Sequence, residues 1–197
     1  MEEEEVIIKR VHGRDGSVMW GGYPKHTFML LGDSGCGKST IFSCFKHSHQ
    51  TPKDSTKIID FANRTLNLEL SSGGKQKATL QCWDTPPPIS GTEPFFDRKY
   101  YETMDSLVFV YNNKQSFKSV ERRVPICRSK TKASFFLVSN RFDDVISDWE
   151  VGERVEKLVK QNDMKLVEIS AQSEGETETL FEQITEQLQK RIASYSD

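Results

Sequence analysis

A nine-residue stretch in the first quarter of the chain combines glycines with lysine and hydroxyl side chains. Residues 32–40, GDSGCGKST, fit the pattern G-x-x-x-x-G-K-[ST], with Gly32, Gly37, Lys38 and Ser39 in the fixed positions. Glycines let the backbone curl until successive N–H groups face phosphate oxygens, beside a helix N-terminus that favours anions. Lys38 would reach the β- and γ-phosphates, and the Ser39 hydroxyl would bind Mg²⁺.

We therefore expect this loop to bind a nucleotide. Its candidate contact residues are Asp33, Ser34, Gly35, Cys36, Gly37, Lys38, Ser39 and Thr40. The alternative is a glycine-rich turn that holds no ligand. The predicted context favours the nucleotide, because a buried strand precedes the loop and a helix follows it, as the motif requires.

Strands and helices alternate along the rest of the chain. The predicted strands are residues 26–32, 65–70, 78–83, 106–111, 133–140 and 165–170. The second and third form a hairpin across the glycines of SSGGK. Helices are predicted from Lys38, over 116–124 with Pro125 ending or kinking it, after the capping-box spacing at Ser147, and over 181–192. This order predicts an open, doubly wound α/β sheet of six mostly parallel strands, flanked by about five helices.

Residues 1–25 precede this pattern and read as an N-terminal extension to a domain of residues 26–197. Two apolar-rich pieces in the extension flank Asp15-Gly16, which suits a small hairpin. A disordered tail is an equally supported alternative.

Composition narrows the classes of function. The 197 residues carry a formal net charge of −2, so no global field attracts nucleic acid or anionic lipid. The four cysteines are far apart in the sequence, which argues against a zinc site and for reduced thiols. No apolar run is long enough to span a membrane, and the last residues, IASYSD, contain no cysteine for prenylation. We expect a soluble cytoplasmic protein without an intrinsic membrane anchor.

The loop and its flanks, LLGDSGCGKSTIFSCF, resemble the first strand, P-loop and helix of Ras-superfamily small GTPases, and Asp33-Ser34 is most similar to the Rab branch. STKIIDF, KYYETMDSLVFVYN, LVSNRFDD and EISAQ resemble further family segments in the family's order. The resemblance covers about residues 26–194 and implies the small-GTPase fold. It also implies GTP or GDP with Mg²⁺ as ligands, the metal being held through Ser39, Thr56 and Asp84.

The resemblance assigns the base-binding residues to two segments. These are Asn140, Arg141 and Asp143 in the first, and Ser170, Ala171 and Gln172 in the second. A carboxylate at Asp143 can accept two hydrogen bonds from guanine, which adenine cannot offer, so the site should reject adenine. Arg141 and Gln172 each replace a lysine of the family, and His49 is the nearest aromatic candidate for the guanine edge.

Three prolines occupy the segment that completes the hydrolytic site in this family. After Asp84-Thr85 the family has A-G-Q-E, whereas this chain has PPPISGTE. Either Pro87 and Pro88 take the glycine and glutamine places, or an insertion gives those places to Gly91 and Thr92. Both alignments lose the glutamine that orients the attacking water. Residues 86–88 should form a stiff, extended polyproline-like segment. The alternative is that these prolines lie in a loop that tolerates them and have no effect on function.

Two functions follow from these features. The first is a Rab-like GTPase with impaired intrinsic hydrolysis, acting through effector or complex-subunit proteins and reaching vesicles or cilia only through them. The second is a pseudo-GTPase that serves as a structural subunit of a larger transport or ciliary complex. A P-loop kinase is a third and weaker option, because no acceptor-site or lid motif is present.

Overall fold

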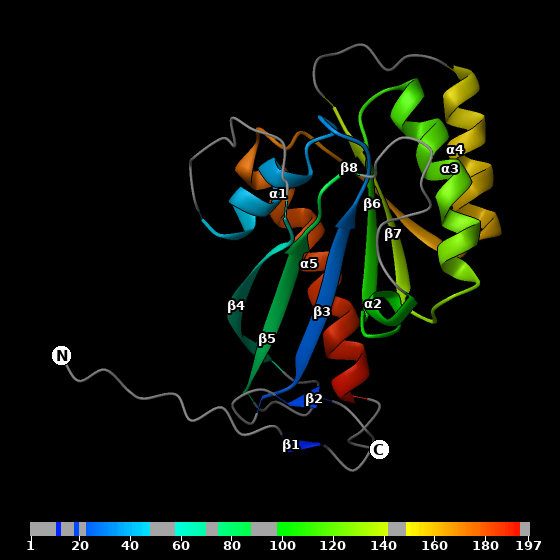
Figure 1. Ribbon diagram of the computed structural model, residues 1–197. Coiled ribbons are helices and arrows are strands. Elements are labelled where there is room, and N and C mark those ends of the chain that lie inside the picture. The colour runs from blue at the N-terminus through cyan, green and yellow to red at the C-terminus, as the bar shows by residue number, and fades with distance from the viewer. Residues whose placement is uncertain are drawn as a thin grey trace.

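The computed structural model describes residues 11–12, 18–19, 23–47, 58–69, 75–87, 98–141 and 149–193. Its centre is a six-stranded sheet in the order β4-β5-β3-β6-β7-β8, in which only the β4–β5 pair is antiparallel (Figure 1). The strands are β3 (Lys25–Leu31), β4 (Asp60–Glu69), β5 (Lys75–Asp84), β6 (Ser106–Tyr111), β7 (Ser134–Asn140) and β8 (Met164–Ile169). This sheet confirms the predicted α/β fold.

Burial along the strands follows their place in the sheet. Every residue of the central strand β6 is buried, as expected for a parallel strand covered on both faces. The edge strand β4 instead alternates, so that Leu66 and Leu68 face inward while Thr65 and Asn67 are exposed. The alternation predicted from the leucines is therefore confirmed.

Five helices of the described chain cover the two faces of the sheet (Figure 1). On one face, α1 (Lys38–Phe45) and α5 (Glu174–Ala193) bury an apolar core in which the Phe45 ring meets Phe28 and Phe181 edge-on. On the other face, α2 (Arg98–Glu102), α3 (Lys114–Arg128) and α4 (Trp149–Gln161) enclose a second core. Two separate apolar cores thus fix the sheet from both sides.

Helix α3 differs from its prediction at both ends. It begins earlier, at Lys114, because Asn113 and Ser116 form a capping box, in which the Asn113 side chain accepts from Ser116 N at 2.9 Å. It does not end at Pro125 but continues to Arg128. Proline removes only one backbone donor, while Cys127, beyond it, stays buried against the sheet and favours continuation. Of the two predicted alternatives, an end of the helix at Pro125 is therefore wrong, and a kink there stays a prediction.

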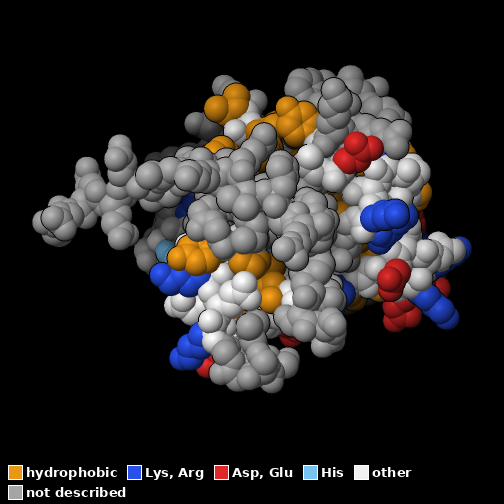
Figure 2. All heavy atoms as spheres, turned by 90° about the horizontal axis from the view of Figure 1, so that it is seen from below, with side chains coloured by type: hydrophobic (Ala, Val, Ile, Leu, Met, Phe, Trp, Pro, Cys, Tyr) orange, Lys and Arg blue, Asp and Glu red, His pale blue; other side chains and the backbone are white. Residues whose placement is uncertain are grey.

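Within the N-terminal extension, β1 (Val11–His12) pairs antiparallel with β2 (Val18–Met19) in a separate two-stranded sheet. The division of the chain at residue 25 stays a prediction. Among the described residues, no helix is both long and apolar enough to cross a membrane. Figure 2 views the molecule from the end where β3 begins, and there Lys and Arg side chains stand beside Asp and Glu rather than in a patch of one sign.

Candidate nucleotide-binding site

The candidate residues gather where parallel strands end. The carboxyl ends of β3, β6, β7 and β8 lie side by side, since Leu31 pairs with Phe109, Tyr111 with Ser139, and Asn140 with Ile169. The loop 32–37 follows β3, Arg141 follows β7, and the segment 170–172 follows β8. Ligands of open α/β sheets bind at this edge. The topology thus brings together segments that are more than a hundred positions apart in the sequence.

Two glycines of the loop are required by its close contacts. Gly37 has a φ of +102°, and a Cβ there would lie 2.1 Å from Asn140 Nδ2. A Cβ on Gly32, with a φ of +156°, would lie 2.4 Å from the Val110 carbonyl oxygen. Larger residues would displace either the loop or its neighbours. The two fixed glycines of the motif therefore have structural reasons in this fold.

Lys38 lies inside the curl of the loop. Its side chain is buried, and Nζ donates to the carbonyl oxygens of Gly32 at 2.9 Å and Asp33 at 2.8 Å. An ammonium has three donors, and among the described residues the third meets only Cys36 Sγ, at 4.0 Å, the outer limit for sulfur. A phosphate oxygen would replace this weak contact with a charge-assisted hydrogen bond. The cation is thus held in place by the backbone while one donor stays available for an anion.

Ser39 and Asp84 form the oxygen-rich side of the site. Ser39 Oγ donates to Asp84 Oδ2 at 2.6 Å, and Asp84 is buried at the end of β5. Next to it, Thr85 Oγ1 donates to the Leu30 carbonyl oxygen at 2.7 Å. Hydroxyl and carboxylate oxygens are ligands that suit Mg²⁺. Thr56, the third predicted ligand, lies outside the described residues.

Asn140 joins the loop to the segment after β8. Its buried side chain donates to the Cys36 carbonyl oxygen at 2.9 Å and accepts from Ala171 N at 2.8 Å. One amide thus uses both of its ends to hold two predicted ligand-binding segments together. Asn140, the first of the predicted base-binding residues, therefore holds both the phosphate loop and the segment after β8 in position.

The other predicted base contacts have separate surroundings. Arg141 pairs with Glu176 of α5 at 3.1 Å, and the same carboxylate oxygen accepts from Ser170 N at 2.8 Å. Gln172 is exposed. Asp143 lies outside the described residues, as do His49, Pro88, Gly91 and Thr92. The carboxylate expected to select guanine and both alternatives for the glutamine place therefore stay predictions.

Two contacts to the loop were missed by sequence reasoning. Arg123 of α3 pairs with the Asp33 carboxylate at 2.9 Å, and Asn112 Nδ2 donates to the Gly35 carbonyl oxygen at 3.1 Å. Asp33 and Arg123 are 90 positions apart, and no local pattern relates them. The ion pair between Asp33 and Arg123 is therefore visible only in the folded structure.

A cluster of aromatic side chains on β4, β5 and α2 was also missed. Phe61 and Trp83 are register partners with ring centroids 6.0 Å apart, and Tyr100 lies 6.4 Å from Trp83. Phe61 is 57% exposed, and Ile58, just before β4, is 77% exposed. Large apolar groups gathered on a surface mark interaction sites. Alternation in β4 was a usable signal, because Phe61 breaks the polar outer row.

Residues 27–190 match the model of the Ras family. The chain belongs to the Ras family. It is 30% identical over 170 residues to the Ras-related protein SEC4 of Candida albicans, an alignment that covers 83% of this chain and 77% of that protein. It is 26% identical over 174 residues to the Ras-related protein Rab-2B of Dictyostelium discoideum, with 85% and 82% coverage.

A third relative is the Ras-related protein Rab-26 of Rattus norvegicus, 29% identical over 171 residues with 83% and 63% coverage. These relatives put this Ras-family protein near the Rab branch, which confirms the resemblance inferred from its motifs. Ras-family proteins bind guanine nucleotide and act in general through effector proteins.

Proposed function

We propose that this Ras-family protein binds GTP or GDP with Mg²⁺, hydrolyses GTP slowly by itself, and acts through protein partners. The observation that carries the proposal is the bridge made by Asn140 between Cys36 and Ala171, beside a Lys38 ammonium already fixed over the loop. A site whose parts are held before the ligand arrives loses little entropy on binding. The proposed contacts to the nucleotide are residues 33–40, 140, 141, 143 and 170–172.

Magnesium would be held through the Ser39 hydroxyl and, by way of water, the Asp84 carboxylate, with Thr56 as the third group. The 2.6 Å contact between Ser39 and Asp84 supports this, because it places both oxygens in reach of one cation. The ion would neutralise charge on the β- and γ-phosphates. For guanine, the proposed selector is Asp143.

Slow hydrolysis is proposed from the segment after β5. Thr85 is buried and anchored to Leu30, and Pro86 and Pro87 follow directly, half-buried and without backbone N–H groups to donate. In the first alignment Pro87 takes the glycine place and has no N–H for the γ-phosphate, and Pro88 in the glutamine place could not orient a water molecule. The alternative alignment, with Gly91 and Thr92 in those places, also lacks the glutamine.

Partner binding is proposed at the aromatic cluster of Phe61, Trp83 and Tyr100. Exposed aromatic groups supply a large contact area at low entropic cost and are common anchors of protein interfaces. The cluster spans β4, β5 and α2, so a partner bound there would contact the elements on either side of the proline segment.

The second candidate function is a pseudo-GTPase that serves as a structural subunit of a larger transport or ciliary complex. The observation that favours it is the same anchored proline segment, because a stiff segment changes shape little with the state of the nucleotide. In this case nucleotide would be a permanent ligand or absent, and the aromatic cluster would hold a constant partner.

Nucleotide extraction from the purified protein, followed by chromatography, tests the proposal. We expect bound GTP or GDP, preference for added guanine over adenine nucleotide, and a shift toward xanthine nucleotide in Asp143→Asn. Lys38→Ala and Ser39→Asn should lose tight binding and the ligand's stabilisation of several kcal/mol, roughly RT ln(1 + [L]/Kd). Lys157→Ala, an exposed lysine on α4, is the matched control and should bind like the wild type.

Single-turnover hydrolysis by the same preparation tests the slow-hydrolysis part of the proposal. The isolated chain should hydrolyse GTP at or below about 10⁻⁴ s⁻¹. A rate above about 10⁻² s⁻¹ would mean that a group near the prolines orients water after all. Equal affinity for ATP and GTP would reject guanine selection, and no nucleotide with no measurable affinity would favour the scaffold.

A further inference from the structure

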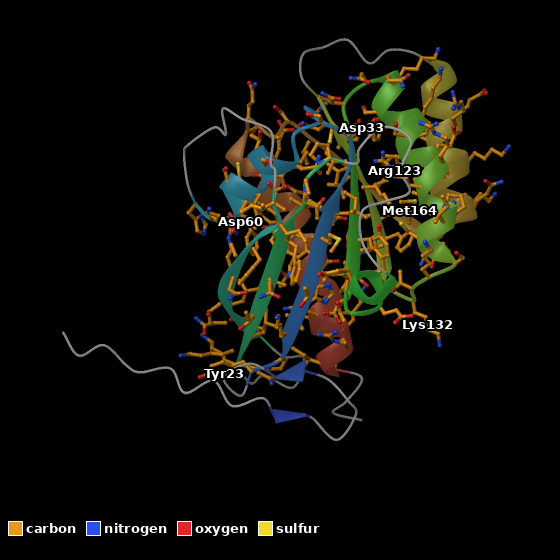
Figure 3. All side chains as sticks on the ribbon, in the orientation of Figure 1. Tyr23, Asp33, Asp60, Arg123, Lys132 and Met164 are labelled. Carbon is orange, nitrogen blue, oxygen red and sulfur yellow. The ribbon has the colours of Figure 1, made fainter. Side chains whose placement is uncertain are left out.

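One charged residue of the phosphate loop is neutralised from outside the loop. Asp33 Oδ1 lies 2.9 Å from the Arg123 guanidinium, and the two side chains are only 26% and 19% exposed. Figure 3 labels both residues, at the same end of the sheet, with Arg123 coming from α3. The pair is partly shielded from water, so its charges are screened less than those of a surface pair.

The carboxylate belongs to the residue that also positions the loop's cation. The Asp33 carbonyl oxygen accepts from Lys38 Nζ at 2.8 Å, and this ammonium is the proposed contact of the β- and γ-phosphates. Asp33 therefore carries its negative charge on the residue whose backbone holds the phosphate-contacting ammonium, within the phosphate loop itself. Without a counter-charge this carboxylate would repel the nucleotide, and it would repel a triphosphate more than a diphosphate.

Arg123 is placed to remove that repulsion. The preceding arginine of α3, Arg122, contacts only groups of its own helix among the described residues, the Lys118 carbonyl and the Ser119 hydroxyl, and so does not reach the loop. Asn112 holds the next part of the loop through the Gly35 carbonyl, but as a neutral amide it cannot balance a charge. The charge on Asp33 is thus matched by a helix that contributes nothing else to the predicted nucleotide contacts.

We propose that Arg123 is a positioning residue that sets the preference of the site for guanosine triphosphate over diphosphate by neutralising Asp33. The inference rests on the proposed nucleotide binding. It assigns a role in nucleotide discrimination to an ion pair between the P-loop and α3. For unit charges roughly 10 Å apart at an effective dielectric constant of about 20, the unbalanced repulsion corresponds to about a tenfold change in affinity.

The test measures the affinities of the full chain for GDP and for a non-hydrolysable GTP analogue, by competition with a fluorescent guanine nucleotide. Arg123→Ala should lower the triphosphate-to-diphosphate affinity ratio by about tenfold, and added salt should shrink this difference. Arg123→Lys keeps the charge and should retain most of the ratio. Arg122→Ala is the matched control and should leave the ratio unchanged.

Removing the carboxylate gives the deciding comparison. The double variant Asp33→Asn with Arg123→Ala has neither charge, so its ratio should return to within a few-fold of the wild type. Asp33→Asn alone leaves the cation and should keep or raise the preference for triphosphate. An unchanged ratio in Arg123→Ala, or a double variant no better than Arg123→Ala, overturns the inference. A wild type that binds neither nucleotide overturns the proposed function itself, which the first measurement shows before any variant is made.

Discussion

At the scale of single residues, the buried amide of Asn140 governs what the loop tolerates. Its two hydrogen bonds, to Cys36 and from Ala171, leave no space between the amide and the backbone of Gly37. The residues that such a loop can accept depend less on the flexibility of its backbone than on the side chain packed against it. Glycine is therefore required at position 37 because the Asn140 side chain leaves no room there for a Cβ.

Gly37→Ala should accordingly be far more harmful than Gly35→Ala. A Cβ at position 37 would lie 2.1 Å from Asn140 Nδ2, whereas a Cβ at position 35 meets nothing within 4 Å, although both residues have positive φ. We expect Gly37→Ala to lose about 2–4 kcal/mol of unfolding free energy and most nucleotide affinity. Gly35→Ala should lose only about 1 kcal/mol, from backbone strain.

Urea unfolding and nucleotide titration of the two variants side by side check this expectation. Equal losses in both would show that the close contact with Asn140 is not what makes glycine necessary, and that positive φ alone explains both positions.

At the scale of elements, one arginine ties the edge of the sheet to two helices. Arg64 of β4 donates to the Cys44 carbonyl oxygen at 2.8 Å and to Glu178 of α5 at 2.9 Å. Its guanidinium also stacks 4.8 Å from the Phe45 ring and 5.0 Å from the Phe181 ring. Arg64 thus adds a positive charge beside the last carbonyl groups of α1, next to the C-cap residue Lys46.

Arg64→Ala should therefore lower the unfolding free energy by about 3 kcal/mol, because carbonyl, carboxylate and ring contacts are lost together. The matched control is Arg154→Ala on α4, a more exposed arginine that pairs with Glu121 of α3 and lies 5.6 Å from the Phe117 ring. Its cost should stay near or below about 1 kcal/mol. Chemical denaturation at one salt concentration compares the two, and similar losses would refute the special role of Arg64.

At this scale, the sequence predicted the elements that are determined by their own residues. It failed where an element depends on contacts with another part of the fold. The strands of the six-stranded sheet followed from apolar runs such as residues 106–111, and the P-loop residues from their own spacing. The five-residue helix α2 was too short to show a period. The course of α3 past Pro125 depended on burial of Cys127 against another element, which no local rule contains.

The candidate site divides in the same way. Its glycines, Lys38 and Ser39 form one contiguous motif and were predictable, whereas the pairing of Asp33 with Arg123 requires two segments to meet in space. The aromatic cluster of Phe61, Trp83 and Tyr100 likewise depends on the register between β4 and β5 and on the position of α2. Contacts between distant elements are fixed by topology, and a single sequence shows them only where a known motif does.

At the scale of the whole molecule, a buried histidine makes stability depend on pH. His26, on β3, lies 2.8 Å from Ser106 Oγ through Nε2, while its buried Nδ1 has no hydrogen-bond partner in the part of the chain that the structure describes. Burial lowers the pKa of His26 to about 4, with Asp105 opposing and Arg191 reinforcing the shift. The folded state thus keeps this ring neutral where the unfolded chain, with a pKa near 6.5, takes up a proton.

Because the unfolded state binds more protons between these two pKa values, stability should fall as pH falls through this window. The contribution is complete above about pH 6.5 and is lost progressively toward pH 4. Between pH 7.5 and 5 we expect a loss of about 2 kcal/mol in the wild type that is absent in His26→Gln.

Denaturant titrations of wild type and variant at both pH values measure this difference. His47→Gln, which replaces an exposed histidine in the same way, controls for the loss of a histidine as such. Parallel pH profiles for the wild type and His26→Gln would show that position 26 contributes nothing to acid sensitivity.

The place of α5 in the fold has a consequence for how the protein is made. Helix α5 closes the core over β3 and α1, and the Asn140–Ala171 bond joins the loop to a segment translated only just before α5. A ribosome releasing the chain at 5–20 residues per second, the usual range, therefore leaves Phe28 and Phe45 uncovered for roughly ten seconds or more after they emerge. Throughout that interval the phosphate loop exists without its second half, so nucleotide can stabilise only a chain that has been translated through residue 171 and α5.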